Sequence, residues 1–404
     1  ELVPIIVGGQ RFYSVSLARP SVDTAPSVGT QSRRNLERCL GATWGRRLGT
    51  AVQQGTARLR KCLYPRTLVR ATKSLGRRFL TADLRARPND LLVLTGSSWS
   101  QPARAAAEAA ARNGIPIGAV IYDLIPIDHP EFFKPSGVRG FREWIDHVTA
   151  VADVFLSISR TTRDRLWQYV QQRYPHRALD PGQFPWFALG SNIDTPKAVG
   201  RLRPDLEQAF SAGRPSGTYL TVSTIEPRKN QAFLLDAFEH VWTEHSEARL
   251  CIVGRIGWLC GELVDRIVGH PRFGRQLFMF NDLSDGELDH CYRHAKAFLF
   301  PSKAEGFGLP IVEALSRGLP VLASDIPIHR EVGGGFCAYF DLADAAALAR
   351  QIDGIERSGS WPAVTPARDY RADDWADSAR DFVHQTLRAA VSLKDRAASQ
   401  QAAA

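Results

Sequence analysis

The sequence lacks long apolar runs, paired cysteines and internal repeats, and each absence excludes a class of protein. No apolar run reaches the roughly 18 residues that a membrane-spanning helix needs. The longest candidate, Ile115–Ile127, is interrupted by Asp123. The six cysteines show neither C-x-x-C pairs nor disulfide-like spacing, which favours a reducing, cytoplasmic compartment. No repeat with a period of roughly 20 to 50 residues is visible, which excludes a solenoid.

Methionine is almost absent as well: Met279 is the only one, and the first residue is Glu1. The first residues, ELVPIIVGG, have the character of a strand already under way, so we expect the natural N-terminus to lie upstream. No signal or transit segment is visible in the residues present. The length of 404 residues predicts about two domains, and 44% hydrophobic with 23% charged residues is typical of a globular protein.

Acidic residues are scarce in one basic segment, although the whole chain carries a net charge of only +9. Between Arg33 and Arg87 there are fifteen Lys or Arg residues and two acids, with apolar residues such as Trp44 interleaved. This pattern is compatible with an anionic membrane surface or a lipid-phosphate acceptor. Nucleic acid is a competing partner. A solvated basic face of helices is the third interpretation, and the sequence leaves all three open.

Strands alternate with helices along most of the chain, which predicts parallel sheets covered by helices on both faces. Residues 1–30 indicate one strand and a polar loop, and residues 31–88 indicate helices broken by glycine and proline. Further elements of the N-terminal half are predicted as strands at Leu91–Leu94, Ile117–Tyr122 and Val154–Ile158, and as helices at Ala103–Arg112, Phe141–Ala150 and Thr161–Arg173.

A proline-bearing segment with little periodicity, Tyr174–Ser216, precedes a second alternating region. That region predicts strands at Tyr219–Ser223, Arg249–Val253, Gln276–Phe280, Ala297–Phe300, Val321–Ala323 and Phe336–Phe340. Its helices are predicted at Gln231–Glu244, Gly261–Gly269, Ser284–His294 (with an S-x-x-E capping box), Pro310–Arg317 and, before a frayed tail, Asp373–Val391. We therefore predict two doubly wound, Rossmann-like α/β domains facing a cleft: residues 1–195, a linker at 196–216, residues 217–370, and a C-terminal helix and tail at 371–404.

One strand–loop–helix stretch, FLFPSKAEGFGLPIVEALSRG at Phe298–Gly318, carries two carboxylates beside a glycine-rich turn. Glu305 lies in the loop, and Glu313 lies one turn into the helix that Pro310 begins. Glycines beside a helix N-terminus let the backbone approach a ligand, and the free N–H groups there suit phosphate oxygens. The two acids are placed to accept hydrogen bonds from hydroxyls, as a sugar and a ribose offer. The alternative is an ordinary βα turn with a capping glutamate.

A second loop, TIEPRKN, follows the strand Tyr219–Ser223 and contains two adjacent cations, Arg228 and Lys229. Because the carboxyl ends of parallel strands meet at one edge of a sheet, we expect this loop to face Glu305. Two cations suit a diphosphate and stabilise its charge when a glycosidic bond to phosphate breaks. The alternative is a surface pair at a helix start, where the helix dipole disfavours cations, so this position favours the functional interpretation.

Four segments carry a resemblance to a known family: VSTIEPRKN, LCIVGRIGW, FLFPSKAEGFGLPIVEALSRGLPVLAS and IPIHREVGG. Together they resemble the retaining GT-B glycosyltransferases of family four, whose hallmark is a glutamate, seven residues and a second glutamate. The likeness covers most of residues 216–345, and residues 117–194 more weakly. It implies that Glu305 binds donor-sugar hydroxyls, that Glu313 binds the ribose hydroxyls, and that Arg228 with Lys229 binds the diphosphate. It also implies donor-binding positions at Gly306, Phe307, Gly308, Leu309, Pro310, Ser223 and Gly254.

In the N-terminal half, YDLIPIDHPEFF resembles the segment in which many family members place a His-Asp pair facing the sugar. Tyr122 occupies the histidine position here and Asp123 follows it. We therefore name Asp123 as a catalytic candidate, with His129 as a replacement histidine; the alternative for His129 is a turn residue before a proline. The candidates on the acceptor side are Tyr122, Ser157 and Ser159. Glu331, in HREV, is a candidate for the far side of the nucleotide, with a loop-end charge as the alternative.

The resemblance implies transfer of a hexose with retention, and GDP-mannose is the donor that the mannosyltransferase-like segments favour. The expected acceptor is a growing, lipid-linked surface polysaccharide, at the inner face of the cell membrane. No cofactor and no metal are expected, because no D-x-D motif occurs and the two cations would replace the metal charge. His290 and His294 have the spacing of a metal pair but no evident third ligand. The family's N-terminal glycine-rich loop has no counterpart here and is expected before Glu1.

Other functions stay open at this point. A nucleotide-sugar epimerase or a phosphorylase of the same fold would keep the donor site and change the reaction. A non-catalytic nucleotide-sugar-binding subunit would be compatible with Tyr122 in the histidine position. A nucleic-acid-binding role rests only on the basic segment 33–87.

Overall fold

The computed structural model describes residues 5–8, 11–14, 90–96, 101–191, 201–211, 217–363 and 365–403. The chain divides into two compact units, of which the first combines residues 1–90 with 100–115 and the second holds the rest. In the first unit, strands β1 (Ile5–Gly8) and β2 (Arg11–Ser14) pair as an antiparallel hairpin, so there are two strands where we predicted one. That unit also holds helix α5 (Gln101–Arg112). The basic segment 33–87 and the helices predicted over 31–88 lie outside the described residues.

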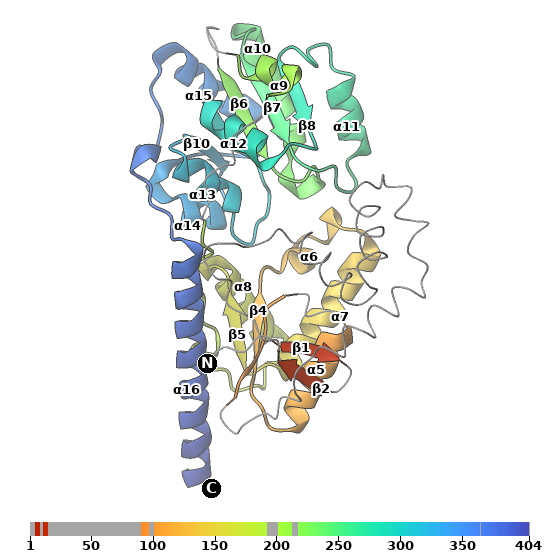
Figure 1. The fold of residues 1–404 in the computed structure, drawn as a ribbon, viewed down its shortest axis with the longest axis vertical. Helices are drawn as coiled ribbons and strands as arrows, with labels where there is room; N and C mark the ends of the chain where they lie inside the picture. Colours follow the sequence, from red (N-terminus) through yellow and green to blue (C-terminus); the bar gives the residue numbers. More distant parts are fainter. Residues whose placement is uncertain are drawn as a thin grey trace, which may run out of the picture. The chain divides into compact units, whose positions relative to one another are not determined.

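The larger sheet of the second unit has six parallel strands in the order β11-β10-β9-β6-β7-β8 (Figure 1). The bounds of these strands are β6 (Thr218–Val222), β7 (Arg249–Val253), β8 (Leu277–Phe280), β9 (Ala297–Phe300), β10 (Val321–Ser324) and β11 (Cys337–Phe340). The chain winds outward from β6 through β7 and β8, then returns to β9 and winds the other way. The order therefore reverses between β6 and β9, which is where ligands bind in doubly wound sheets.

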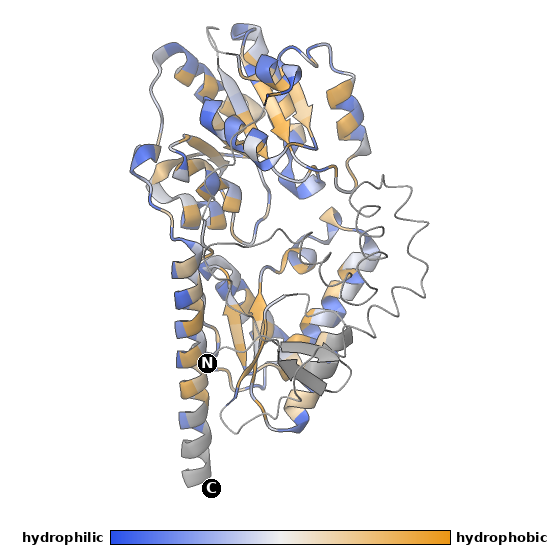
Figure 2. Cartoon of the chain, viewed as in Figure 1, coloured by the Kyte–Doolittle hydropathy of each residue, from blue (hydrophilic) through white to orange (hydrophobic). Residues whose placement is uncertain are grey.

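Both faces of this sheet are covered, because successive residues along its strands are buried rather than alternating between buried and exposed. Figure 2 shows β7 and β8 mostly in orange. Leu250 and Ile252 pack on one face with helices α10 (Gln231–Glu244) and α15 (Ala345–Ser358). Cys251 and Val253 pack on the opposite face, in a core to which several other helices contribute. Those helices are α9 (Pro204–Ala209), α12 (Asp285–His294) and α13 (Leu309–Ser316). The helices α11 (Gly261–Val268) and α14 (Pro327–Gly333) complete the set between strands.

The smaller sheet is also parallel and has the order β3-β4-β5 among the described residues. Its strands are β3 (Leu92–Leu94), β4 (Ile117–Ile121) and β5 (Val154–Ser157). Helices α6 (Ile125–Asp128), α7 (Pro135–Val151) and α8 (Arg160–Arg173) follow β4 and β5. The side chains of β4 and β5 are all buried, which is expected of a sheet covered on both faces.

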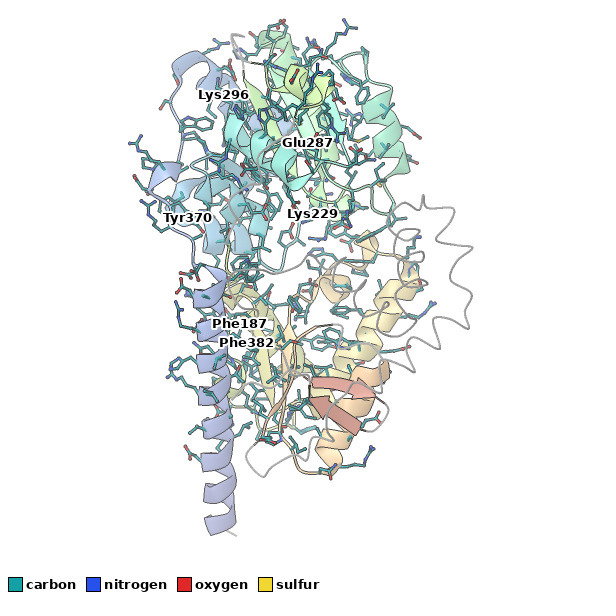
Figure 3. The ribbon with its side chains drawn as sticks, viewed as in Figure 1. Phe187, Lys229, Glu287, Lys296, Tyr370 and Phe382 are labelled. Carbon is teal, nitrogen blue, oxygen red and sulfur yellow. The ribbon has the colours of Figure 1, made fainter. Side chains whose placement is uncertain are left out.

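The long C-terminal helix α16 (Trp375–Ala403) packs on the smaller sheet although it follows the larger one in sequence. Phe382 meets Phe187, with ring centroids 5.1 Å apart (Figure 3), and the Ser378 hydroxyl donates to the Ala188 carbonyl. The helix continues through the tail that was predicted to fray. None of the helices in the described part of the chain is both long and apolar enough to cross a membrane.

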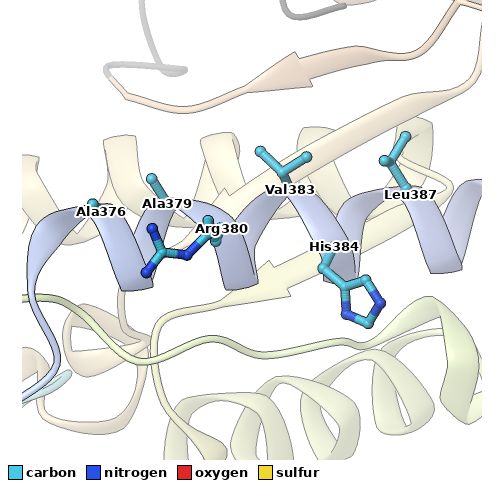
Figure 4. A pocket seen from close by; sticks show the side chains of 6 residues that line it. All are labelled: Ala376, Ala379, Arg380, Val383, His384 and Leu387. Carbon is cyan, nitrogen blue, oxygen red and sulfur yellow. The ribbon is translucent and has the colours of Figure 1, made fainter.

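A different side of α16 carries a shallow hollow of about 520 Å³ (Figure 4). The lining residues are Ala376, Ala379, Arg380, Val383, His384 and Leu387. The hollow is formed by one helix and lies far in sequence from the loops at the carboxyl ends of the strands. It is therefore not a candidate for the site predicted from the motifs.

Part of the predicted linker at 196–216 belongs to the core of the larger sheet. Leu206 and Ala209 of α9 are fully buried and pack with Leu220 of β6 and Phe278 of β8. The remaining residues, 196–200 and 212–216, lie outside the described part of the chain. Four of the helices in the described part of the chain were not predicted at all: α6, α9, α14 and α15.

Candidate functional site

Two loops meet at the point where the strand order of the larger sheet reverses. The first follows β6 and ends in a short 3-10 helix, η4 (Pro227–Lys229), before α10. The second follows β9 and carries Glu305. The backbone N–H of Lys303 donates to the carbonyl of Arg228 at 2.8 Å, so the two loops are hydrogen-bonded to one another. The structure thus joins the two loops that the sequence predicted to face each other.

Glu305 is held between the two cations. Its Oε2 accepts from Nη1 of Arg228 at 2.8 Å, and its Oε1 accepts from Nζ of Lys229 at 2.5 Å. The side chains of Glu305 and Lys229 are both less than a tenth exposed. Lys229, labelled in Figure 3, also lies over the ring of Phe300, 5.3 Å from its centre. A charged trio this well covered is costly to assemble and is held together by mutual attraction.

Glu226 is a fourth member of this cluster, and sequence reasoning overlooked it. Its carboxylate accepts from Nε of Arg228 at 2.7 Å, and its side chain is 2% exposed. Nε of Arg228 therefore donates to Glu226, and Nη1 donates to Glu305 and to the Ala304 carbonyl. The signal was available in the sequence, because Glu226 lies two residues before Arg228. Two carboxylates hold the guanidinium in one orientation.

The pKa values of the cluster follow from burial and from the partner charges. Burial alone would raise the pKa of Glu305, but attraction by Lys229 and Arg228 outweighs it and leaves the pKa below its ordinary value. Burial lowers the pKa of Lys229, with Glu305 opposing the shift. Burial raises the pKa of Glu226, against the attraction of Arg228. Glu305 is therefore ionised at neutral pH.

The turn after Glu305 is shaped by two glycines. Gly308 has φ of 107°, a conformation that residues with a side chain rarely adopt, and it caps the N-terminus of α13. A Cβ at Gly306 would lie 2.3 Å from the carbonyl oxygen of Tyr122, so only glycine allows this approach. Phe307 is buried in a cluster with Val120 and Ile158 of the smaller sheet. Leu309 and Pro310 form the first turn of α13.

The other predicted donor-binding residues lie on neighbouring elements of the same sheet. Glu313, half-buried on α13, accepts from the hydroxyl of Tyr292 at 2.8 Å. Ser223 accepts from the side-chain amide of Gln231 at 2.9 Å. A Cβ at Gly254 would lie 1.7 Å from the Ser223 carbonyl oxygen, so the ends of β6 and β7 touch at these two predicted positions.

Asp123 is the N-terminal candidate that the structure brings to the cluster. A Cβ at Gly306 would stand 3.2 Å from Cβ of Asp123, and the Asp123 carboxylate feels the charges of both Arg228 and Glu305. Burial raises its pKa, although a hydrogen bond from the Ile125 N–H and the attraction of Arg228 oppose the rise. Asp123 and Glu226 are thus the two carboxyl groups of this site whose pKa is raised by burial.

The remaining N-terminal candidates differ in what their side chains contact. The Ser159 hydroxyl lies 2.9 Å from the Gly306 carbonyl and caps α8, so Ser159 contacts the donor-side turn. Tyr122 has its backbone at the same turn, but its hydroxyl donates to the Thr95 carbonyl at 2.6 Å. His129 contacts Glu131 and stacks on Phe132. Those contacts lie within the loop of His129. That loop reaches the Glu305 loop through Phe132, which packs with Ala304 and whose ring centre lies 5.9 Å from Nζ of Lys303.

Ser157 and Glu331 complete the set of candidates. Ser157 is fully buried, and its N–H donates to the Pro185 carbonyl. Glu331 accepts from the backbone N–H groups of Arg160 and Thr161, at 2.7 and 2.8 Å. Glu331 lies within α14, and its carboxylate caps helix α8, a partner that its sequence position did not indicate.

Metal ligands were considered at His290 and His294. Their rings stack with centroids 3.9 Å apart, and Nδ1 of His294 bonds to the carbonyl of His290. Among the residues that the structure describes, no group of three or more His, Cys, Asp or Glu side chains is arranged to hold a metal ion.

Sequence comparisons relate this chain to glycosyltransferases. Residues 206–364 match the family model "Glycosyl transferases group 1", a segment that begins within α9. The chain is 30% identical over 236 residues to the serotype-specific mannosyltransferase WbdA of Escherichia coli, covering 58% of this chain and 29% of that protein. It is 28% identical over 251 residues to the O-antigen chain mannosyltransferase B of Escherichia coli, covering 61% of this chain and 63% of that protein. The chain thus spans less than two thirds of the length of these relatives.

A structural comparison concerns the fold. The crystal structure of Anabaena Alr3699/HepE in complex with UDP-glucose superposes with a TM-score of 0.52 at 18% identity, covering 75% of this chain and 78% of that chain. At this identity the likeness shows the fold alone. The α/β architecture with two Rossmann-like domains, predicted from the sequence, is confirmed, as is the similarity to GT-B glycosyltransferases over the C-terminal half.

Proposed function

We propose that this chain is a retaining glycosyltransferase that moves a hexose from a nucleotide sugar to a bacterial surface polysaccharide. The observation that carries the proposal is the buried cluster of Glu305, Arg228 and Lys229 at the switch point of the six-stranded sheet. It joins a carboxylate that suits sugar hydroxyls to a cation pair that suits a diphosphate. A structural ion pair needs neither this location nor a glycine-rich turn beside it.

The cations act on the leaving group. When the bond between the anomeric carbon and the diphosphate oxygen breaks, its electron pair moves to that oxygen, and Arg228 and Lys229 stabilise the charge. Glu226 fixes the guanidinium before the donor arrives, so little reorganisation is needed at the moment of reaction. Glu305 stays ionised and binds hydroxyls of the sugar. The two cations supply the charge that a bridging metal supplies elsewhere, which supports a metal-independent reaction.

Asp123 is the group proposed on the opposite side of the sugar. Its raised pKa lets it accept and hold a proton more readily than an exposed aspartate does. In the proposed reaction the acceptor hydroxyl attacks from the face that the diphosphate leaves and gives its proton to the departing diphosphate oxygen, so the anomeric configuration is retained. No covalent intermediate with the protein is required.

Mannose from GDP-mannose is the leading donor, and a lipid-linked glycan at the membrane is the leading acceptor. The support is the names of the matched relatives, a serotype-specific mannosyltransferase and an O-antigen chain mannosyltransferase. The basic segment 33–87 supports attachment to an anionic membrane surface.

Transfer and hydrolysis of labelled GDP-mannose, compared with UDP-glucose, test this function. The protein should release sugar or transfer it from one donor, and Glu305→Gln should lose the activity by roughly a hundredfold or more. Arg350→Ala is the matched control, because Arg350 pairs with Asp344 on the exposed face of α15. Undiminished turnover in folded Glu305→Gln would overturn the assignment. Conversion of the donor without an acceptor, to an epimeric nucleotide sugar, would assign an epimerase instead.

A further inference from the structure

A buried histidine adjoins the cluster and has no role in the proposed reaction so far. His329 lies in the first turn of α14, after β10, the strand next to β9. It is fully buried, and its ring lies 5.0 Å from the ring of Phe300. A Cβ at Gly308 would stand 3.8 Å from Cδ2 of His329. The imidazole therefore lies directly behind the glycine-rich turn that follows Glu305.

The hydrogen bonds of Ser324 determine which ring nitrogen carries the proton. The Ser324 hydroxyl donates to the Ser302 carbonyl at 2.5 Å, so its only proton is already used. Nδ1 of His329 lies 3.0 Å from both the hydroxyl oxygen and the carbonyl oxygen of Ser324. Both oxygens can then only accept, and Nδ1 must be the donor. In the neutral ring, Nε2 consequently carries a lone pair and no proton.

That lone pair has no partner among the described residues. A buried acceptor without a hydrogen bond costs stability, and such groups in native structures call for an explanation. Protonation of the ring does not remove this cost at neutral pH, because burial lowers the pKa of His329 to about 4, with Glu305 and Ser324 opposing the shift. Cδ2, the carbon bonded to Nε2, is the ring atom nearest to Gly308, so Nε2 is at the edge of the ring nearest the turn.

We infer that Nε2 of His329 accepts a hydrogen bond from a hydroxyl of the bound nucleotide sugar. A lone pair recognises an O–H or N–H group and rejects phosphate oxygens, which have no proton to give at neutral pH. The inference rests on the proposed function and adds a residue to its donor site. Glycine at 308 places no side chain of its own against this ring edge, where a Cβ would also meet Ile311 at 3.6 Å and Phe300 at 3.9 Å.

The hydroxyl is assigned to the hexose rather than to the ribose. His329 feels the charges of Glu305 and Lys229, the residues proposed at the sugar and the diphosphate. Glu313, the residue proposed at the ribose, accepts a hydrogen bond from Tyr292 of α12. A hexose hydroxyl held by both Glu305 and His329 would have its position fixed from two sides. Such an arrangement discriminates between sugars that differ at that carbon.

Two substitutions separate the two nitrogens of the ring. The Asn amide in His329→Asn can still donate to the Ser324 carbonyl, as Nδ1 does, but nothing replaces Nε2. The longer side chain in His329→Gln brings an oxygen to the Nε2 position. Calorimetric affinities for GDP-mannose and GDP, and for UDP-glucose and UDP, should be measured for both variants and the unchanged protein. Thermal unfolding of each variant reports whether it is folded.

We expect His329→Asn to weaken binding of the preferred nucleotide sugar roughly 2- to 10-fold, with binding of its nucleoside diphosphate unchanged. His329→Gln should recover part of the loss. Equal weakening for both ligands would move the contact to the ribose and overturn the hexose assignment. Unchanged sugar binding in folded His329→Asn would overturn the inference and leave the proposed function intact. If neither nucleotide sugar nor diphosphate binds the unchanged protein, the proposed function and this inference fail together.

The unchanged protein provides a readout that does not depend on folding of variants. The ¹⁵N resonance of Nε2 in the neutral ring should shift towards a hydrogen-bonded value on addition of the nucleotide sugar, and less on addition of the diphosphate. No shift with a saturating nucleotide sugar would contradict the contact.

Discussion

Acidification should destabilise this protein through the buried imidazole of His329. In an unfolded chain the pKa of histidine is about 6.5, whereas burial lowers the pKa of His329 to about 4 in the folded protein. Between these two values the unfolded chain binds a proton that the folded protein does not. Stability therefore falls as the pH drops from about 6.5 towards about 4, and this contribution changes no further below that range.

The size of the effect follows from the two pKa values. Each pKa difference of one corresponds to about 1.4 kcal/mol, so the fall from 6.5 to about 4 amounts to about 3 kcal/mol. Neighbouring charges are already included in this value: Glu305 raises the pKa, and Lys229 lowers it. Other groups titrate in the same range, so the contribution of His329 must be isolated by difference.

Urea unfolding of the unchanged protein and of His329→Gln, followed by circular dichroism at several pH values, isolates it. Glutamine does not titrate, so the difference in unfolding free energy between the two proteins should change by about 2.5 kcal/mol between about pH 7.5 and about pH 4.5. The change should favour the variant at the acid end. A difference that stays constant over this range would refute the reasoning. An NMR titration of His329 that gives an ordinary pKa would do the same.

Three further predictions concern the free energy of unfolding. Gly254→Ala should destabilise by about 3 kcal/mol or more, because its Cβ would lie 1.7 Å from the Ser223 carbonyl. Gly354 lies inside α15 with open space around it, so Gly354→Ala should instead stabilise by roughly 0.5–1 kcal/mol. Thermal unfolding measures both glycine variants. Arg228→Ala should cost roughly 3–5 kcal/mol, because buried Glu226 loses its ion-pair partner and Glu305 keeps only Lys229. Adding Glu305→Gln should restore part of that loss, and a double variant no more stable than the single one would contradict the pairing.

The sequence predicted correctly those features that depend on residues close together in the chain. Ser284 begins α12 with the predicted capping box, and the loops that carry Arg228 and Glu305 face each other as expected. Local rules are sufficient there because each loop follows its strand directly. The order of the strands is not local, so the position of β10 beside β9 could not be predicted. For that reason His329, twenty-four residues after Glu305, could not be related to the cluster.

Side-chain direction was equally out of reach. Tyr122 does stand at the predicted position, but its hydroxyl turns to Thr95, which belongs to a different strand end. The extent of α16 was underestimated for another reason. Its last residues, rich in alanine, have high intrinsic helix propensity, and we gave more weight to their position at the chain end.

The position of α16 has a consequence for synthesis on the ribosome. The strand β5 ends at Ser157, but the helix that covers part of its sheet begins only at Trp375. At roughly 5–20 residues per second, the ribosome needs roughly 10 to 45 seconds to make the intervening chain. During that time the apolar surface later covered by Phe382 and Ala389 stays open on the nascent protein. The larger sheet can fold first, and the smaller sheet is completed by helix α16, which emerges after it.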